Sequence, residues 1–342
     1  MPSHIAHTLL AEDLFVALKA ALPDIPELDD TAGRLLALAS QGPDIFLHNH
    51  RRKPRGFRYG ALLHRKGNDR LLAYFATQIA SLEDLRQREL ALVVAYGYIS
   101  HVWLDRIVHP YINFHAGWRG VPDRDAERPA MHAFLERLID VQLLDHLRGE
   151  TVQGYRFYQR LPVSRSSTSF LLPMIADGIR AALVSAETDT RLHTRLRNAL
   201  RDTLSYYRFT AAPDADYFRQ ARRAELHGTV GFRWLAVVHP PAELIAFDSL
   251  NIAHKRWHHP CDRQIVSNDS VPDLYRAALE RSVRSCSVFT AAVASGRSND
   301  VADDIGQYNL NDGRYSDPPC RRRFAEPLPV LELYRSIKDH YS

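Results

Sequence analysis

The residues best suited to chemistry in this chain lie in one stretch, residues 96–111. His101, Asp105 and His109 are spaced four residues apart, with apolar residues between them. On a helix of 3.6 residues per turn, each step of four rotates by only about 40°, so the three side chains share one face. Two imidazoles and a carboxylate are costly to bury among apolar neighbours unless something pairs them. The spacing therefore predicts a helix whose inner face binds a divalent metal ion.

A single metal ion cannot satisfy this helix face. His101 and His109 lie two four-residue steps apart, which is about 12 Å along a helix axis at 1.5 Å per residue. Zinc–ligand bonds are about 2 Å long, so the two imidazoles cannot share one ion. Asp105 lies between them and could join the first ion or bridge two. We therefore expect a cluster of metal ions whose remaining ligands come from elsewhere in the chain.

A second pair repeats the four-residue spacing. His132 and Glu136 fall on a predicted helix over residues 130–148, where apolar residues recur at helical intervals. One such pair is common by chance, but two pairs within residues 101–136, together with the in-phase His109, indicate a metal site. Imidazole and carboxylate ligands without cysteine suit zinc first, with manganese or iron as substitutes.

The elements that must position these groups are helices. Apolar residues at helical spacing predict further helices, and the chain shows no convincing β-alternation. The expected fold is therefore all-α: one multi-helix domain with a helical C-terminal extension over residues 1–296, and an irregular tail, residues 297–342, packed on it. Besides 130–148, the predicted helices include residues 4–22, 71–80, 90–105, 171–186, 190–208 and 271–295.

Three local signals modify this pattern. The helix that carries the first motif must end or bend after Pro110, because proline lacks the donor for a helical hydrogen bond. Gly42-Pro43 forces a turn and leaves Asp44 displayed at a bend. Residues 48–58 are basic and aromatic, which predicts a loop in which His48 and His50 are solvated.

Composition narrows the functional classes. Of the 342 residues, 45% are hydrophobic and 25% charged, as in a globular protein that buries a core. The net charge of +4 is small, and no basic stripe marks a nucleic-acid surface, so no specific nucleic-acid partner is expected. Histidine is the one residue type in excess, with nine of its 17 copies in the first 132 residues.

Location follows from what the sequence lacks. No stretch approaches the roughly 18–20 consecutive apolar residues that span a membrane, so we expect no transmembrane segment. The N-terminus carries no secretory signal. Three widely spaced cysteines predict neither a disulfide framework nor a zinc finger. The expected location is the cytoplasm.

The candidate ligands form an ordered set along the chain: His7, Gly-Pro-Asp44-Ile-Phe, His64, His101-x-x-x-Asp105, His109 and His132-x-x-x-Glu136. This set resembles the bacterial zinc-dependent phospholipase C family, which is related to the S1/P1 nucleases. The match covers roughly residues 1–140 and continues more loosely through Asp248-x-Leu-Asn251 and Trp257. The ending His-x-x-x-Glu is the phospholipase form, whereas the nucleases have His-x-x-x-Asp.

The resemblance implies an all-helical fold that holds three zinc ions in a cleft. It assigns one ion to Asp44, His64, His101 and Asp105, and a second ion to His109, His132 and Glu136. Asp105 would bridge to a third ion, which His7 and the N-terminal end of the chain would also hold. Asp44 is in addition the candidate general base.

Two departures from the family pattern stand out. The secreted enzymes bind the third zinc with a processed N-terminal tryptophan, whereas this chain begins Met-Pro. The amine of Pro2 or the imidazole of His4 would then take that place, or the third site would be empty and the chain would hold two ions. The histidine after Asp105 also comes sooner here, at His109, and it fits the helix face better than His115.

The expected function is a zinc-dependent phosphodiester hydrolase, similar to phospholipase C, in which activated water attacks phosphorus. The resemblance implies a phosphodiester substrate, with a phospholipid head group the first candidate. The alternatives are a nuclease or phosphatase on the same site, or a non-catalytic metal-binding scaffold. A structural zinc site is closed by four protein ligands, and the second ion would have only three, which favours catalysis. Nearby aromatic residues could line a choline pocket or be ordinary packing: Phe46, Phe57, Tyr59 and Tyr111.

Overall fold

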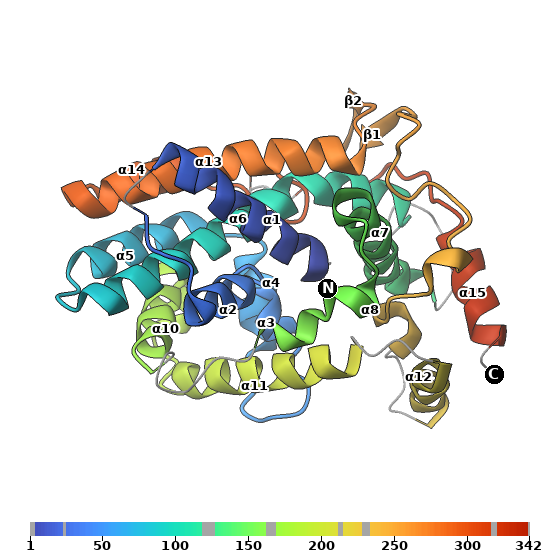
Figure 1. Ribbon diagram of the computed structural model, residues 1–342, viewed down its shortest axis with the longest axis horizontal. Helices are drawn as coiled ribbons and strands as arrows, with labels where there is room; N and C mark the ends of the chain where they lie inside the picture. Colours follow the sequence, from blue (N-terminus) through green and yellow to red (C-terminus); the bar gives the residue numbers. More distant parts are fainter. Residues whose placement is uncertain are drawn as a thin grey trace.

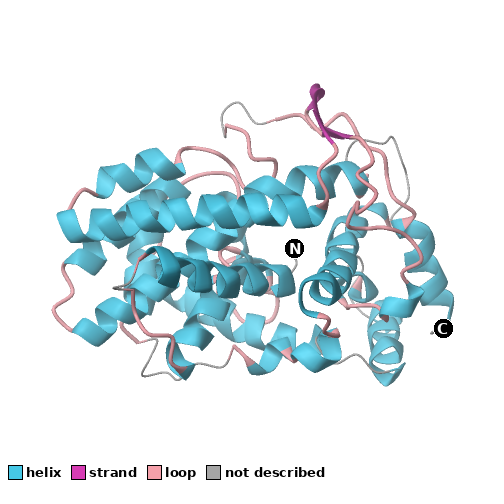
Figure 2. Ribbon diagram, turned by 45° about the horizontal axis from the view of Figure 1, so that its top comes forward, coloured by secondary structure: helices cyan, strands magenta, loops and turns pink. Residues whose placement is uncertain are grey.

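The computed structural model describes residues 4–22, 25–117, 127–161, 169–210, 215–227, 233–315 and 320–340. Over these residues the chain has an all-α fold, in which a short β-hairpin is the one sheet (Figures 1 and 2). The helices are α1 (His4–Ala21), α2 (Asp30–Ala39), α3 (Asp44–Leu47), α4 (Phe57–Leu63), α5 (Asn68–Ala80), α6 (Leu85–His115), α7 (Met131–Arg148), α8 (Val152–Tyr155), α10 (Leu171–Ala182), α11 (Leu192–Thr210), α12 (Ala215–His227), α13 (Val271–Ser295), α14 (Ser298–Ile305) and α15 (Val330–His340).

Helix α6 is the central element. It begins where the Asp84 side chain accepts a hydrogen bond from the Gln87 N–H, and it continues for 31 residues. It packs most extensively on α13, which lies beside it along the top of Figure 1, and also on α2 and α1. Because neighbours cover it on several sides, almost every residue from Leu90 to Phe114 is buried. The face that carries the first motif is therefore held away from bulk water.

The sequence predicts that the helix ends or bends after Pro110, and of these two outcomes the end is wrong. The helix runs on to His115 with the proline inside it. A proline in a helix costs about 3 kcal/mol. The last turn offsets this cost because Tyr111, Ile112 and Phe114 are almost completely buried, and burying a large apolar side chain contributes about 1.5–3 kcal/mol.

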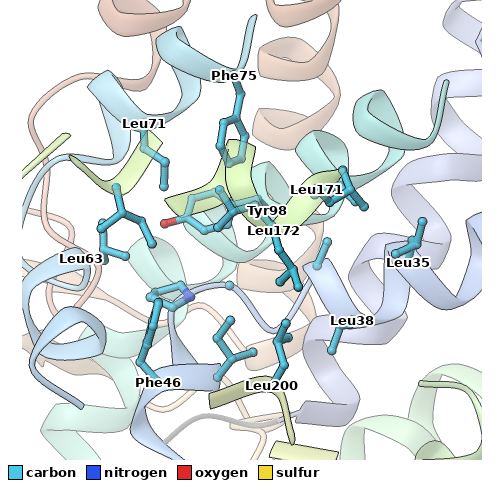
Figure 3. Close-up of a pocket in the computed structure, with 17 residues that line it drawn as sticks. Leu35, Leu38, Phe46, Leu63, Leu71, Phe75, Tyr98, Leu171, Leu172 and Leu200 are labelled. Carbon is cyan, nitrogen blue, oxygen red and sulfur yellow. The ribbon is translucent and has the colours of Figure 1, made fainter. Parts of the chain in front are cut away.

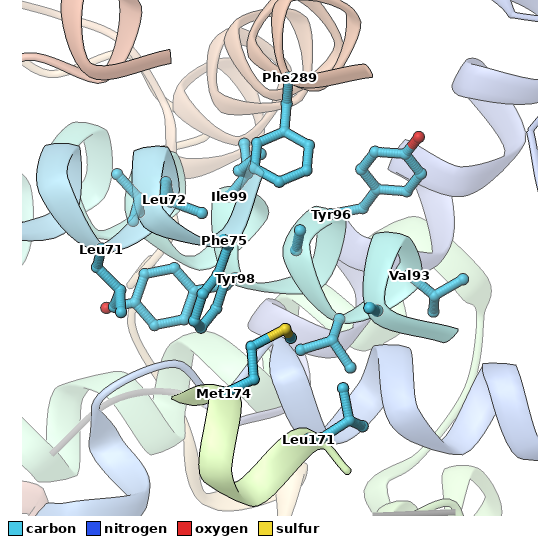
Figure 4. Packing of buried hydrophobic residues seen from close by; sticks show 14 of the residues in the cluster. Leu71, Leu72, Phe75, Val93, Tyr96, Tyr98, Ile99, Leu171, Met174 and Phe289 are labelled. Carbon is cyan, nitrogen blue, oxygen red and sulfur yellow. The ribbon is translucent and has the colours of Figure 1, made fainter. Parts of the chain in front are cut away.

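Two apolar cores meet at α6. Leu104, Val108 and Tyr111 belong to one core, which is shared with α7 and the amino end of α1. Tyr96 and Ile99 belong to the other, which includes α5, α10 and part of α13 and which Figure 4 shows around Phe75 and Phe289. The candidate site lies on α6 between the two cores.

The predicted helices over residues 4–22, 130–148 and 271–295 correspond to α1, α7 and α13. The tail after residue 296 is more regular than expected, because it contains α14 and α15. Val330, Leu331, Tyr334 and Ile337 are the buried residues of α15, and this helix packs on α7. Their spacing of one, three and three residues is helical, and it was the signal for α15 in the sequence.

A hairpin and a disulfide also differ from expectation. β1 (Trp257–His259) pairs antiparallel with β2 (Asp262–Ser267), in a segment without alternating polarity. A disulfide joins Cys261, at the turn of this hairpin, to Cys320, so two of the three cysteines pair after all. Cys286 is free and buried. In the described part of the chain, no helix is both long and apolar enough to cross a membrane.

The loop before α4 buries one of its histidines. His48 is 3% exposed, and its ring stacks on Tyr206 with centroids 4.2 Å apart. Asp202 fastens the loop by accepting hydrogen bonds from the Arg51 and Arg52 N–H groups. The prediction that His48 is solvated is therefore wrong, whereas His50 is exposed as expected.

The tight contact of α6 with α2 at Gly97 gives a stability prediction. A Cβ on Gly97 would lie 2.8 Å from the Leu36 carbonyl oxygen and 2.9 Å from Ala39 Cβ. We expect Gly97→Ala to lower the free energy of unfolding by about 1–3 kcal/mol, the usual cost of overpacking, despite the better helix propensity of alanine. Urea unfolding measures this difference.

Gly33→Ala is the matched control. Gly33 lies inside α2, and a Cβ added to it would meet only the Leu28 side chain, at 3.8 Å. This variant should be more stable than the wild type by about 0.5–1 kcal/mol, the helix-propensity gain alone. Equal stability of Gly97→Ala and the wild type would mean that the α2–α6 contact is looser than the structure shows.

Candidate metal centre

Helix α6 presents its three motif residues on one buried face, as the spacing predicts. His101 Nε2 lies 3.2 Å from Asp105 Oδ2. His109 Nε2 lies 3.6 Å from Asp105 Oδ1. Asp105 therefore stands between the two imidazoles and offers one oxygen to each.

The turn before α3 brings Asp44 to this face. Gly42 has a φ of +49°, and a Cβ there would lie 2.5 Å from the His101 ring, so the close approach needs glycine. Asp44 is the first residue of α3, and its Oδ1 lies 3.0 Å from Nε2 of His64, at the end of α4. One ligand atom from each of Asp44, His64 and His101 falls within 4.8 Å of the others, so this group could hold a metal ion.

Gly42 and Pro43 border a second feature. They line an apolar cavity of about 80 Å³, together with leucines from α2, α10 and α11 (Figure 3). Tyr98 also lines this cavity, and its hydroxyl donates a hydrogen bond to Asn68 Oδ1 at 2.7 Å. The turn that presents Asp44 thus lies between a polar site and an apolar cavity.

Helix α7 supplies the second group. Glu136 Oε1 lies 3.0 Å from His132 Nε2 and 3.3 Å from His109 Nε2. Ligand atoms of the three residues fall within 4.8 Å of one another. The His132 side chain is 13% exposed, more than any other side chain of the centre, so solvent reaches the centre most easily on this side.

Helix α1 completes the arrangement with His7. Its Nε2 lies 3.2 Å from Asp105 Oδ1, and its ring stacks on His101 with centroids 4.2 Å apart. A small cavity of about 20 Å³ is bordered by His7, Asp105, His109 and Glu136. That volume is enough for one water-sized species, but most of the cavity lining is apolar and includes Leu104. The cavity therefore borders the polar groups and is not itself an ion site.

Three of the imidazoles are oriented in the same way. The Nδ1–H group of His64 donates to the Gly60 carbonyl at 2.7 Å, and that of His101 to the Ser40 carbonyl at 3.0 Å. The Nδ1–H group of His109 donates to a carbonyl at 2.6 Å. Each Nε2 lone pair is thereby left to face the carboxylates. Metal-binding histidines use this pattern, in which the second ring nitrogen is fixed by a hydrogen bond.

Several polar atoms at the centre lack hydrogen-bond partners. Both Asp44 oxygens, Asp105 Oδ2 and His101 Nε2 are buried, and none of them makes a hydrogen bond to the described residues. The nearest imidazole nitrogens lie 3.0 Å from Asp44 Oδ1 and 3.2 Å from Asp105 Oδ2. Burying carboxylates in this way costs several kcal/mol unless a counter-charge is present. A divalent cation would supply that charge and accept the lone pairs, so the donor set fits a metal.

The pKa shifts indicate strong electrostatic coupling between the carboxylates and the imidazoles of the centre. Burial alone would raise the pKa of Asp44 and Asp105, but the neighbouring imidazoles outweigh it and lower both pKa values. Burial alone would lower the pKa of His64, His101 and His109, but the carboxylates outweigh it and raise all three. At His7 and His132 the carboxylates do not outweigh burial, and both pKa values are lowered, so only some of the imidazoles favour the protonated form.

A neighbouring polar cluster was not foreseen. Asp140 on α7 accepts the backbone N–H of Ala6 at 2.8 Å and the Nε2–H of His239 at 2.9 Å. His4 lies in this cluster, with its Nδ1 2.6 Å from Arg137 Nη1. His4 is thus placed beside an arginine rather than in the group formed by His7, His101 and Asp105. Pro2, the other candidate for the third ion, lies outside the described residues.

The aromatic residues proposed for a choline pocket are mostly packed in the interior. Phe46, Tyr59 and Tyr111 are at most 1% exposed and belong to the apolar cores. Phe57 is exposed at the surface. Packing therefore accounts for the first three of these side chains.

All eight predicted site residues converge in three adjoining groups. Two of the groups share His101, and the third lies next to Asp105 through His109. No family model, curated protein or solved structure matches the chain. The case for a metal centre therefore comes from the distances, burial and hydrogen bonds of these residues.

The shifted pKa values predict how metal binding depends on pH. A metal ion must displace protons from His64, His101 and His109, whose pKa values are raised. Lowering the pH through those values favours the protonated, metal-free state. Zinc affinity should therefore fall at least tenfold per pH unit between about pH 7 and pH 5.5, with release of more than one proton on binding. Competition with a chromophoric chelator measures the affinity, and a pH-independent affinity would contradict this assignment.

Proposed function

We propose that this chain is a zinc-dependent phosphodiester hydrolase, similar in its site to the bacterial zinc-dependent phospholipase C family. The observation that carries the proposal is the convergence of five histidines with three carboxylates in a buried centre that contains no cysteine. Nitrogen and oxygen donors of this kind suit zinc. The fold is all-α, which agrees with that family but is shared by many others.

The proposed assignment of ligands follows the three groups. Asp44, His64 and His101 would hold one ion together with Asp105. Asp105 would also face a further ion beside His7. The last group, His109, His132 and Glu136, would hold another ion and leave a coordination position open.

The chemistry divides between the ions and the chain. Bound zinc ions would lower the pKa of a water molecule and neutralise the oxygens of a phosphate ester. The carboxylates and imidazoles fix the ions on helices, and the surrounding apolar residues exclude other water. Asp44 Oδ1 faces His64 at 3.0 Å, so we assign it to metal binding and assign Oδ2 as the atom that accepts the proton of the attacking water. Substrate would approach on the side of His132, where the centre is most exposed.

A substrate panel tests the proposal. Protein stripped with a chelator and reconstituted with zinc would be offered a phosphocholine diester, a dinucleotide and a phosphomonoester. We expect zinc-dependent cleavage of the phosphocholine diester that is absent from the stripped protein. Cleavage of the dinucleotide alone would indicate a nuclease, and cleavage of the monoester alone a phosphatase. Loaded protein that cleaves none of the three would indicate a scaffold.

The second ligand group is tested by Glu136→Gln or His132→Ala. We expect either variant to lose one metal ion and nearly all hydrolysis while the far-ultraviolet circular dichroism stays helical. Glu150→Gln, at an exposed position just after α7, is the matched control and should behave as wild type. Unchanged turnover in Glu136→Gln would place the reaction elsewhere.

Asp44→Asn separates the two roles assigned to Asp44. If Asp44 is a ligand only, metal content and activity should fall together. If it also accepts the proton, turnover should fall by about 10²–10⁴-fold, the usual size of a general-base effect, with only partial loss of metal. We expect the second outcome from parallel metal analysis and kinetics. A variant that keeps both its metal and its full rate would remove Asp44 from the mechanism.

A further inference from the structure

A loop from the C-terminal part of the chain reaches the metal centre. Leu310, in the 306–314 loop, accepts the hydrogen bond from His109 Nδ1–H at 2.6 Å through its carbonyl oxygen. The Leu310 N–H donates to the His64 carbonyl at 2.8 Å, and the Asn311 side chain donates to the same carbonyl at 3.1 Å. One short loop thus contacts two of the proposed ligand residues.

Helix α6 holds this loop through side chains next to its proposed ligands. Arg106, which is buried, donates from Nη1 to the Ile305 carbonyl at 2.6 Å and from Nη2 to the Tyr308 carbonyl at 2.7 Å. One turn beyond His109, Asn113 donates to the Asn311 carbonyl at 2.6 Å. The loop is therefore fastened on both sides of His109.

Two residues define the shape of the loop. Asn309 Oδ1 accepts the backbone N–H of Asn311 and of Asp312, each at 2.9 Å. Gly313 has a φ of +68°, and a Cβ there would lie 2.5 Å from the Arg106 carbonyl oxygen. That carbonyl has no helical partner four residues on, because Pro110 lacks an N–H group. The Arg106 carbonyl is therefore open to the loop, and residue 313 can pack this closely against it only when it has no Cβ.

We propose that the 306–314 loop is a positioning element for the metal ion held by His109, His132 and Glu136. The Leu310 carbonyl keeps the proton of His109 on Nδ1 and leaves Nε2 free to bind, while Asn309 and Gly313 hold that carbonyl in place. His64 and His101 obtain the same orientation from Gly60 and Ser40, so their ion depends less on the loop. This inference rests on the proposed metal centre.

The test compares matched glycine variants of the full chain. Gly313 and Gly296 both have positive φ, but a Cβ on Gly296 meets no atom within 4 Å. Gly296→Ala therefore reproduces the backbone strain without the contact to α6. Asn309→Ala is a second loop variant that leaves residue 313 unchanged. Zinc stoichiometry and affinity are measured by chelator competition, and thermal unfolding of the metal-free proteins reports stability separately.

We expect Gly313→Ala and Asn309→Ala to bind one of the zinc ions about 10- to 100-fold more weakly, the usual effect of losing a group that orients a ligand. Gly296→Ala should bind zinc as the wild type does, even if its melting temperature falls. If Gly313→Ala does not fold, the zinc affinity of Asn309→Ala decides the test. Wild-type zinc affinity in a folded loop variant would overturn the positioning role alone. A wild-type chain that binds no zinc would overturn the proposed function and this inference with it.

Discussion

The free-energy cost of burying carboxylates is the main constraint on the candidate metal centre. Asp44, Asp105 and Glu136 are each almost fully removed from water, at the place where two apolar cores meet on α6. Isolated carboxylates in such surroundings would be strongly destabilising. Five histidines from three helices and the end of a fourth surround them, and the resulting donor set is complementary to divalent cations. The long buried helix, the glycine turn before α3 and the loop beside His109 can all be understood as means of bringing these groups together.

Much of this centre could be predicted from the sequence, because its main signal is local. The spacing of His101, Asp105 and His109 fixes one helix face whatever the rest of the chain does, and the pair on α7 repeats it. The turn that displays Asp44 could also be predicted, because it depends only on the adjacent residues Gly42 and Pro43. These features need only the geometry of a single helix or turn.

The features that were missed depend on contacts between distant segments. The helix continues through Pro110 because tertiary packing compensates for the lost hydrogen bond, which local rules cannot foresee. His48 is buried by Tyr206, Cys261 pairs with Cys320, and Leu310 orients His109, each across a long stretch of chain. The C-terminal part therefore belongs to the site as well as to the fold, although its sequence carries no ligand motif. Residues 1–140 contain the candidate ligands but not the loop whose Leu310 carbonyl accepts the hydrogen bond from His109.

The central claim is that the buried centre holds metal, and elemental analysis tests it most directly. Protein purified without exposure to chelators would be examined by inductively coupled plasma mass spectrometry against an accurate protein concentration. This account predicts at least two zinc ions per chain. Less than one equivalent of any transition metal per chain would contradict it.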